Sequence, residues 1–204
     1  LESGSRIEFL NENVRLGMYR PFAKRYFYYS PQLNEVQYQT PKIFKGDNRS
    51  ITFMGDSTDK SYFSLAIDKV PDLNFVSPAS GGTQTLPRYR FTRSDQRVDN
   101  ITDWALNKFT KRYGKKAGVT KDAIFAYCYA VLHDPVYREK YALNLKREFP
   151  RIPFYPDFAQ WVEWGETLLD LHIDYEEVEP YPLKRVDTPN AKRAEGSHPK
   201  PKLK

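Results

Sequence analysis

The sequence predicts an α+β fold in which a β-rich subdomain precedes a four-helix subdomain and an extended basic tail. The first half is interrupted by Pro and Gly and contains short runs of aromatic and β-branched residues, which favour strands. The second half carries apolar residues at helical spacing, and from Pro180 onward the chain is rich in Pro, Lys and Arg. We therefore expect boundaries that give segments 1–98, 99–176 and 177–204.

The expected strands are short and lie in the first half, at residues 26–30, 51–54 and 62–67. Polar residues at 55–59 supply a turn between the second and the third. The stretch 75–91 has no helical period, so we expect a loop that leads into an edge strand.

The expected helices begin at capping side chains in the second half. The candidate N-caps are Asp99 or Asn100, then Thr120, then Asp134. Gly114 is placed to end the first helix, and Pro135 suits the first position of the third. Tyr137, Tyr141 and Leu145 should line that third helix, and the fourth runs from Phe158 to His172 with the clearest apolar period. We expect the four helices to form a compact bundle.

The net charge of +6 is unevenly distributed along the chain. Residues 1–98 carry 14 Lys and Arg against 10 Asp and Glu, and residues 99–149 carry 10 against 6. Residues 150–179 carry 1 against 8, whereas the segment from residue 180 carries 7 against 2. Such segregation is compatible with a phosphate-binding face, and equally with a solvated surface plus a charged tail.

Motifs for chemistry are missing from the sequence. It has no Gly-rich cofactor loop after a strand, no phosphate-cradling G-x-x-x-x-G-K-[ST] loop and no Glu-x-Lys strand motif of a metal-dependent nuclease. His133, His172 and His198 have no ligand-spaced partners, and His172 is expected to be a core residue. Cys128 is expected to pack in the core. We therefore predict no catalytic residue, no metal site and no cofactor in this chain.

The expected cellular compartment is inferred from the lack of a membrane-spanning segment and of a signal peptide in the sequence. No apolar stretch reaches the length of a membrane span, and no signal-peptide pattern is present at the N-terminus. A single cysteine suits a reducing compartment. We expect a soluble, cytoplasmic protein with no membrane partner.

Basic and aromatic residues alternate between Arg20 and Tyr29. Arg and Lys can neutralise phosphates and Arg can read guanine edges, so the run suits a nucleic-acid surface. The alternative is plain strand pleat, with aromatics facing inward and cations outward. Further polar candidates are Asn34, Gln37, Gln39 and Gln84, together with a second basic cluster at Arg88, Arg90 and Arg93.

Taken in order, several motifs resemble one protein family across nearly the whole chain. They are the Tyr-Arg-Pro-Phe-x-x-Arg-Tyr run at 19–26, Leu33-Asn34-Glu35, Ile67 through Leu73, Asn100 through Leu106, Lys121 through Phe125, Leu132-His133, Tyr137 through Tyr141, and Leu145 through Phe154. The set is similar to the C-terminal specificity region of Type ISP restriction-modification enzymes and related predicted helicases.

The resemblance implies a target recognition domain at the end of a polypeptide that also carries nuclease, helicase-type ATPase and adenine methyltransferase modules. Residues 1–98 would then be the DNA target recognition subdomain, which binds double-stranded DNA sequence-specifically and directs methylation and cleavage by the other modules. The implied partners are DNA and the parent's methyltransferase domain, in a prokaryotic cytoplasm. S-adenosylmethionine, ATP and Mg²⁺ would belong to the parent enzyme, itself a DNA methyltransferase.

The candidate DNA-contacting residues are the polar side chains of the non-helical half. They are Arg20, Lys24, Arg25, Gln39, Lys42, Gln84, Arg88 and Arg90. One alternative is a helical docking or coupling module between domains of the parent enzyme, for which the acidic segment and aromatic helices are suited. Another is a stand-alone enzyme, which would need a pocket of convergent polar groups with perturbed ionisation.

Overall fold

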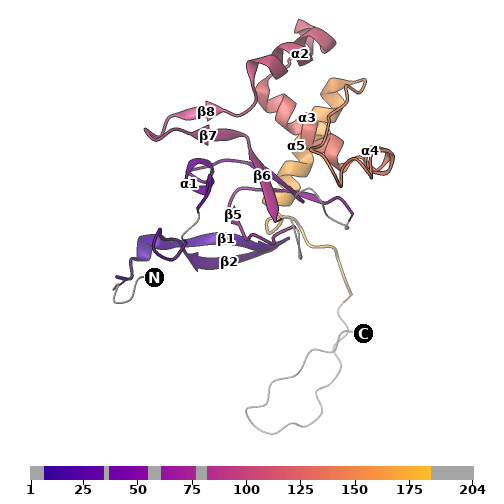
Figure 1. The fold of residues 1–204 in the computed structure, drawn as a ribbon. Helices are drawn as coiled ribbons and strands as arrows, with labels where there is room; N and C mark the ends of the chain where they lie inside the picture. The colour runs from indigo at the N-terminus through magenta and orange to yellow at the C-terminus, as the bar shows by residue number, and fades with distance from the viewer. Residues whose placement is uncertain (1–6, 35–36, 55–60, 77–81, 185–204) are drawn as a thin grey trace.

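The α+β prediction is confirmed by a computed structural model, in which small sheets come first along the chain and the longer helices follow (Figure 1). The structure describes residues 7–34, 37–54, 61–76 and 82–184. The expected turn at 55–59 and most of the basic tail lie outside these ranges. Residues 177–184 form neither helix nor strand. The three segment boundaries stay predictions.

The first sheet has the order β2-β1-β5 and is built on an antiparallel hairpin. Strand β1 (Val14–Arg20) follows the short 3-10 helix Asn11–Asn13 and pairs with β2 (Ala23–Tyr28), while β5 (Val70–Pro71) pairs with β1 in parallel. The strand expected at 26–30 therefore begins earlier than predicted and has an unpredicted partner. Strand β1 was not predicted from the sequence, because Gly17 and alternating cations interrupt its apolar pattern.

The second sheet, with the order β4-β3-β6, contains the most deeply buried strands. All residues of β3 (Ser50–Met54) and β4 (Ser64–Ile67) are buried, which explains why they read as short continuous apolar runs. Strand β6 (Thr83–Pro87) pairs only with β3 among the described strands, in agreement with the expected edge strand. Beyond it, β7 (Tyr89–Phe91) and β8 (Arg97–Asp99) form a separate two-stranded hairpin.

Helix α3 (Lys121–His133) lies at the centre of the helical part and contacts the other long helices. Thr120 caps it as predicted, because its hydroxyl oxygen accepts a hydrogen bond from the Ala123 amide at 3.0 Å. Helix α2 (Asp103–Tyr113) ends at Gly114 as expected, but its cap is Thr102, not Asp99 or Asn100. Asp99 is in strand β8 instead, where its carboxylate forms ion pairs.

The third predicted helix is shorter than its apolar spacing indicated. Helix α4 (Pro135–Lys140) starts after the Asp134 cap, but turns follow at Tyr141, so Tyr141 and Leu145 are not helical. The 3-10 helix Lys115–Ala117 lies between α2 and α3. After α4, the Pro-rich segment leads to the Asp157 cap of α5 (Phe158–Ile173). The only α-helix in the described residues of the first half is α1 (Thr40–Ile43). The four expected helices are grouped around α3 and are not equal members of a bundle.

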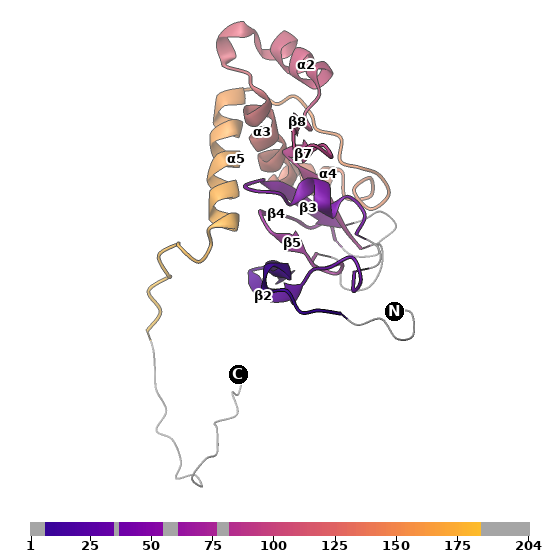
Figure 2. The same cartoon turned by 90° about the vertical axis from the view of Figure 1, so that its left-hand side faces the viewer.

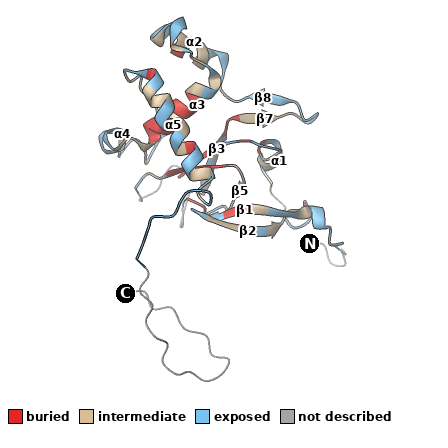
Figure 3. Cartoon of the chain, turned by 180° about the vertical axis from the view of Figure 1, so that it is seen from behind, coloured by how far each residue is buried: buried red, intermediate tan, exposed pale blue. Residues whose placement is uncertain are grey.

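The core joins the sheets to the helices. Ile51 of β3 and Ala66 of β4 belong to the same buried cluster as the apolar residues of α3 and α5 (Figure 3). At the α3–α5 crossing, a Cβ on Gly165 would lie 1.9 Å from the carbonyl oxygen of Ala126, so only glycine permits this approach. A second cluster, around Met18 and Phe75, fills the space between the two three-stranded sheets.

His172 is a core residue with a satisfied nitrogen, as predicted. The Tyr129 hydroxyl accepts a hydrogen bond from the Ala66 amide at 2.7 Å and is hydrogen-bonded to His172 Nδ1, 2.6 Å away. Cys128 packs against the main core cluster, and burial raises the pKa of its thiol to about 12. This thiol is consequently protonated and poorly nucleophilic. No helix in the described part of the chain is long and apolar enough to span a bilayer.

Candidate nucleic-acid interface

The β7–β8 hairpin projects away from the helices, and α1 lies beside it (Figures 1 and 2). Its turn is closed by the Thr92 amide, which donates to the Gln96 carbonyl oxygen at 2.9 Å. Asp95 adopts a φ of 59°, a left-handed conformation that Asp tolerates in turns. The hairpin thus presents a narrow two-stranded ribbon to solvent.

Arg88 fixes the base of this hairpin to the helical part. Its side chain is only 6% exposed, and its guanidinium contacts Asp99 at 2.7 Å and Asp122 at 2.5 Å. The Arg88 hydrogen bond is the largest cause of the lowered pKa of Asp99, to which Lys121 also donates at 3.2 Å. Since Asp122 lies in the first turn of α3, these ion pairs join the β7–β8 hairpin to the helix that organises the core.

Asn48 holds α1 against β7. Its buried amide nitrogen donates to the carbonyl oxygens of Ile43 and Tyr89, each at 2.8 Å, and its Oδ1 accepts from the Tyr89 amide at 3.1 Å. Lys45, just after α1, forms an ion pair with Asp95 in the hairpin turn. Both ends of the contact are therefore fixed, and α1 lies side by side with the hairpin.

We define the recognition surface as the exposed polar side chains of α1 and of both faces of the β7–β8 ribbon, which are Gln39, Lys42, Arg90, Arg93 and Arg97. Arg90 pairs with Val98 and Arg97 with Phe91, so Arg90 and Arg97 lie on opposite faces of this ribbon. The guanidinium of Arg97 stacks on the Tyr89 ring at 4.3 Å, which leaves its N–H edges available. Within the described ranges, none of its four cations forms an ion pair with the protein. Free guanidinium edges on a rigid support can bind phosphates or guanine edges.

Three of the eight sequence-predicted residues, Gln39, Lys42 and Arg90, are brought together on this surface. Arg88 lies beneath it, with its guanidinium occupied by two carboxylates, so its geometry suits support of the surface. Gln84 is exposed on β6, where it lines a pocket with Phe53 and Phe149, apart from the other candidates. Whether each of these residues contacts DNA stays a prediction.

The remaining three candidates lie on the β1–β2 hairpin. Arg20 forms an ion pair with Asp72 at 2.9 Å, and Lys24 forms one with Glu176 at 2.7 Å. The hydrogen bond that Lys24 donates to Glu176 is the main reason that the pKa of Lys24 is raised. Arg25 is exposed and has no carboxylate partner among the described residues.

Two residues of the recognition surface, Arg93 and Arg97, were not among the eight candidates. Arg93 was visible only as a member of the basic cluster that includes Arg88 and Arg90. Arg97 had no sequence signal, because β8 is three residues long and entirely exposed. Its pairing with β7, which only the folded chain reveals, places it beside Tyr89.

Metal-ligating side chains do not gather in the described part of the chain: no group of three or more His, Cys, Asp or Glu could hold an ion there. His133 and His172 are partly buried, and burial lowers the pKa values of both imidazoles. Both side chains are therefore neutral at pH 7. Fold and surface together define a cationic recognition module, whose polar groups serve binding and structural support.

The family of this module is shown by its match to known proteins. Residues 1–204 match the family described as the Type ISP C-terminal specificity domain, and the chain belongs to that family. No curated protein matches the chain.

Three solved structures that this chain is similar to are DNA complexes. A cryo-EM structure of a DrdV–DNA complex is 46% identical over 90% of this chain, with a TM-score of 0.84. A nuclease-deletion mutant of the Type ISP restriction-modification enzyme LlaGI, in complex with a DNA substrate mimic, is 31% identical over 85%, with a TM-score of 0.69. The ATP-dependent Type ISP enzyme LlaBIII, bound to DNA, is 28% identical over 85%, with a TM-score of 0.74. This chain covers only 18%, 15% and 12% of those chains, respectively.

Proposed function

We propose that this chain is the DNA target recognition part of a Type ISP restriction-modification enzyme and that it binds double-stranded DNA through the recognition surface. The observation that carries the assignment to this surface is its set of cations, on a projecting hairpin and on α1, that have no carboxylate partner among the described residues. A major groove about 12 Å wide admits a two-stranded ribbon, and arginine is the commonest reader of guanine there. Phosphate contacts from Lys42 and its neighbours would set the register, and hairpin side chains would read bases.

Chemistry would be performed by other parts of the parent polypeptide. Our proposal assigns adenine methylation, ATP-driven translocation and cleavage to those parts, together with S-adenosylmethionine, ATP and Mg²⁺. Its support is the small share of the solved DNA-bound enzymes that this chain covers.

The same proposal includes docking of the parent's methyltransferase domain on this chain. The supporting observation is that large apolar side chains are exposed on the helical part, away from the recognition surface. They include Trp104 at 70%, Val136 at 68%, Leu143 at 71% and Phe149 at 63% exposure.

Fluorescence anisotropy of a labelled mixed-sequence duplex, titrated with the chain between 50 and 200 mM salt, tests DNA binding. We expect log Kd to rise linearly with log salt, with a slope of roughly 0.9 per neutralised phosphate. A chain that binds no duplex at low salt, or binds with an affinity independent of salt, would contradict the proposal and favour a docking module.

A further inference from the structure

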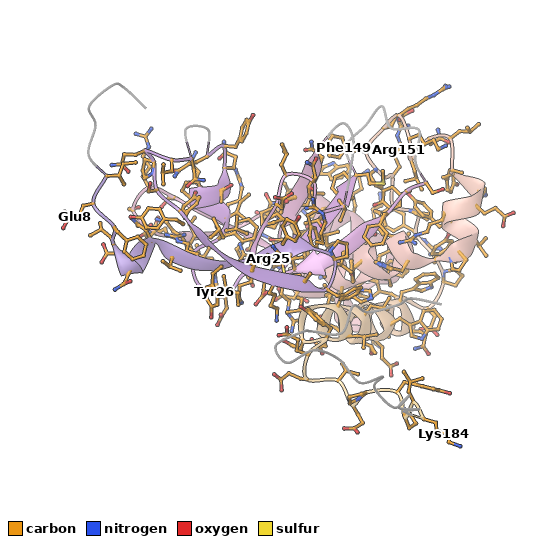
Figure 4. All side chains as sticks on the ribbon, turned by 90° about the horizontal axis from the view of Figure 1, so that it is seen from below. Glu8, Arg25, Tyr26, Phe149, Arg151 and Lys184 are labelled. Carbon is orange, nitrogen blue, oxygen red and sulfur yellow. The ribbon has the colours of Figure 1, made fainter. Side chains whose placement is uncertain are left out.

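A second cationic surface lies on the β1–β2 hairpin, on the strand face formed by Arg15, Gly17, Tyr19, Arg25 and Phe27. We call it the β1–β2 outer face. Its members share a face because side chains alternate along a strand and Gly17 pairs with Arg25, while Arg15 pairs with Phe27. Figure 4, viewed from below, shows Arg25 on this side of the molecule.

Tyrosine rings hold the guanidinium groups of this face in place. Arg15 lies over the Tyr29 ring at 4.6 Å, and Arg25 lies over the Tyr19 ring at 4.5 Å. Arg20 also stacks on Tyr19, at 4.2 Å, but Asp72 already neutralises it. A stacked guanidinium loses less freedom on binding and keeps its N–H edges free for an anion.

Arg15 and Arg25 remain free to meet an outside partner. Both are exposed, and neither forms an ion pair within the described ranges. They are diagonal neighbours on one face of an antiparallel pair, so their side chains start ~7–8 Å apart. That separation suits two consecutive phosphates of one nucleic-acid strand.

A hollow that is mainly apolar lies beside Arg25. Its volume is about 230 Å³, and it is lined by Gly17, Tyr19, Phe27, Val70 and Pro71, with Arg25 also on its wall. Asp72 lines it too, but its carboxylate is paired with Arg20. Gly17 is required there, since a Cβ would lie 2.7 Å from the Phe27 ring and 2.8 Å from the Val70 carbonyl oxygen. An apolar hollow beside a stacked guanidinium fits the deoxyribose next to the phosphate that Arg25 would bind.

We propose that the β1–β2 outer face is a sequence-independent clamp for the DNA backbone, separate from the recognition surface, in which Arg15 and Arg25 each bind a phosphate. This inference rests on the proposed function, since it adds a second contact to a DNA-binding chain. It assigns the two surfaces different tasks: the recognition surface discriminates between sequences, and the clamp contributes affinity to all of them.

The test compares the wild-type chain with the double variant Arg15→Ala, Arg25→Ala on a mixed-sequence 30-bp duplex between 50 and 200 mM salt. We expect about tenfold weaker binding at 100 mM salt and a salt slope smaller by roughly 1.8, for two lost phosphate contacts. Arg112→Ala is the matched control, because Arg112 is also exposed and stacks on a tyrosine, Tyr113, at 5.5 Å on helix α2. It should leave both quantities unchanged.

The Arg15→Lys, Arg25→Lys variant separates charge from folding. It should restore most of the salt slope, whereas a merely misfolded hairpin would not be rescued. A double alanine variant that binds with the wild-type affinity and slope would overturn the clamp alone. A wild-type chain that binds no duplex would overturn the clamp together with the proposed function.

Discussion

At the scale of single residues, Arg88 differs most from what its type suggests. An arginine in a basic cluster is expected to face a ligand, but this one is 5% exposed and contacts two carboxylates of its own chain. Burial lowers its pKa, but the hydrogen bonds to Asp99 and Asp122 outweigh burial and raise the pKa overall. The side chain therefore remains charged and supports the hairpin that carries Arg90.

We expect Arg88→Ala to lower the free energy of unfolding by about 1.5–3 kcal/mol, because it removes the charged hydrogen bonds to Asp99 and Asp122, although Asp99 keeps Lys121 as a partner. Arg90→Ala should change stability by less than about 0.5 kcal/mol, as for other exposed positions. Urea unfolding followed by circular dichroism measures both. Equal stabilities of the two variants would show that Arg88 does not support the hairpin.

Buried histidines make stability depend on pH. His133 Nδ1 donates to the Tyr129 carbonyl oxygen at 2.9 Å, and burial lowers the pKa of its imidazole from 6.5 to about 4. As the pH falls, the His133 imidazole is protonated near pH 6.5 in the unfolded chain but only near pH 4 in the folded chain. The free energy of unfolding is therefore unaffected by this residue above about pH 7 and decreases as the pH falls from 6.5 toward 4.

Unfolding free energies at pH 7.5, 6 and 5 should therefore decrease in that order. His133→Gln should flatten part of the slope, and the remainder belongs to His172, whose pKa burial also lowers. A slope identical in His133→Gln and the wild type would exclude this origin.

At the scale of elements, the crossing of α3 and α5 depends on one glycine. Alanine is favoured over glycine in a helix by about 1 kcal/mol, so Gly165→Ala would stabilise an isolated α5. In the folded chain the added Cβ would lie 1.9 Å from the Ala126 carbonyl oxygen, and the helices would have to separate. We therefore expect Gly165→Ala to destabilise the folded chain, because the clash at the helix crossing outweighs the gain in helix propensity.

Thermal unfolding of Gly165→Ala should show a net loss of about 3 kcal/mol or more, at the upper end for overpacked cores. Thr167→Ala, at an exposed position of the same helix, is the control and should change stability by under about 0.5 kcal/mol. A gain in stability for Gly165→Ala would contradict the close approach of the helices.

At the scale of the whole molecule, local signals in the sequence predicted the fold class and several helix boundaries. Thr120, Asp134 and Gly114 act through neighbouring backbone groups, so their roles were readable without tertiary structure. The recognition surface was only partly predictable. Lys42 lies on the element that Asn48 fixes to β7, and Arg97 lies on the strand that pairs with β7, and neither contact has a local signature.

The charge pattern also acquires a meaning only in the folded chain. Part of the acidic segment lies on α5, where Glu166 and Asp170 pair with Arg49 at 3.2 and 2.8 Å. These carboxylates thus neutralise a cation of the β-rich half. The cations of the recognition surface lie on the projecting hairpin and α1 and keep their charge available for a partner.

The recognition surface is the part of the molecule that we propose discriminates between DNA sequences. The most direct test of this proposal is repeated selection of duplexes from a random library by the wild-type chain and by the variant Arg90→Ala, Arg93→Ala, Arg97→Ala, followed by sequencing of the bound pools. Each lost guanine contact should cost about 1–3 kcal/mol of discrimination, so the wild type should enrich one motif and the variant should enrich it weakly or not at all. Enrichment of the same motif to the same degree by both chains would show that sequence is read elsewhere.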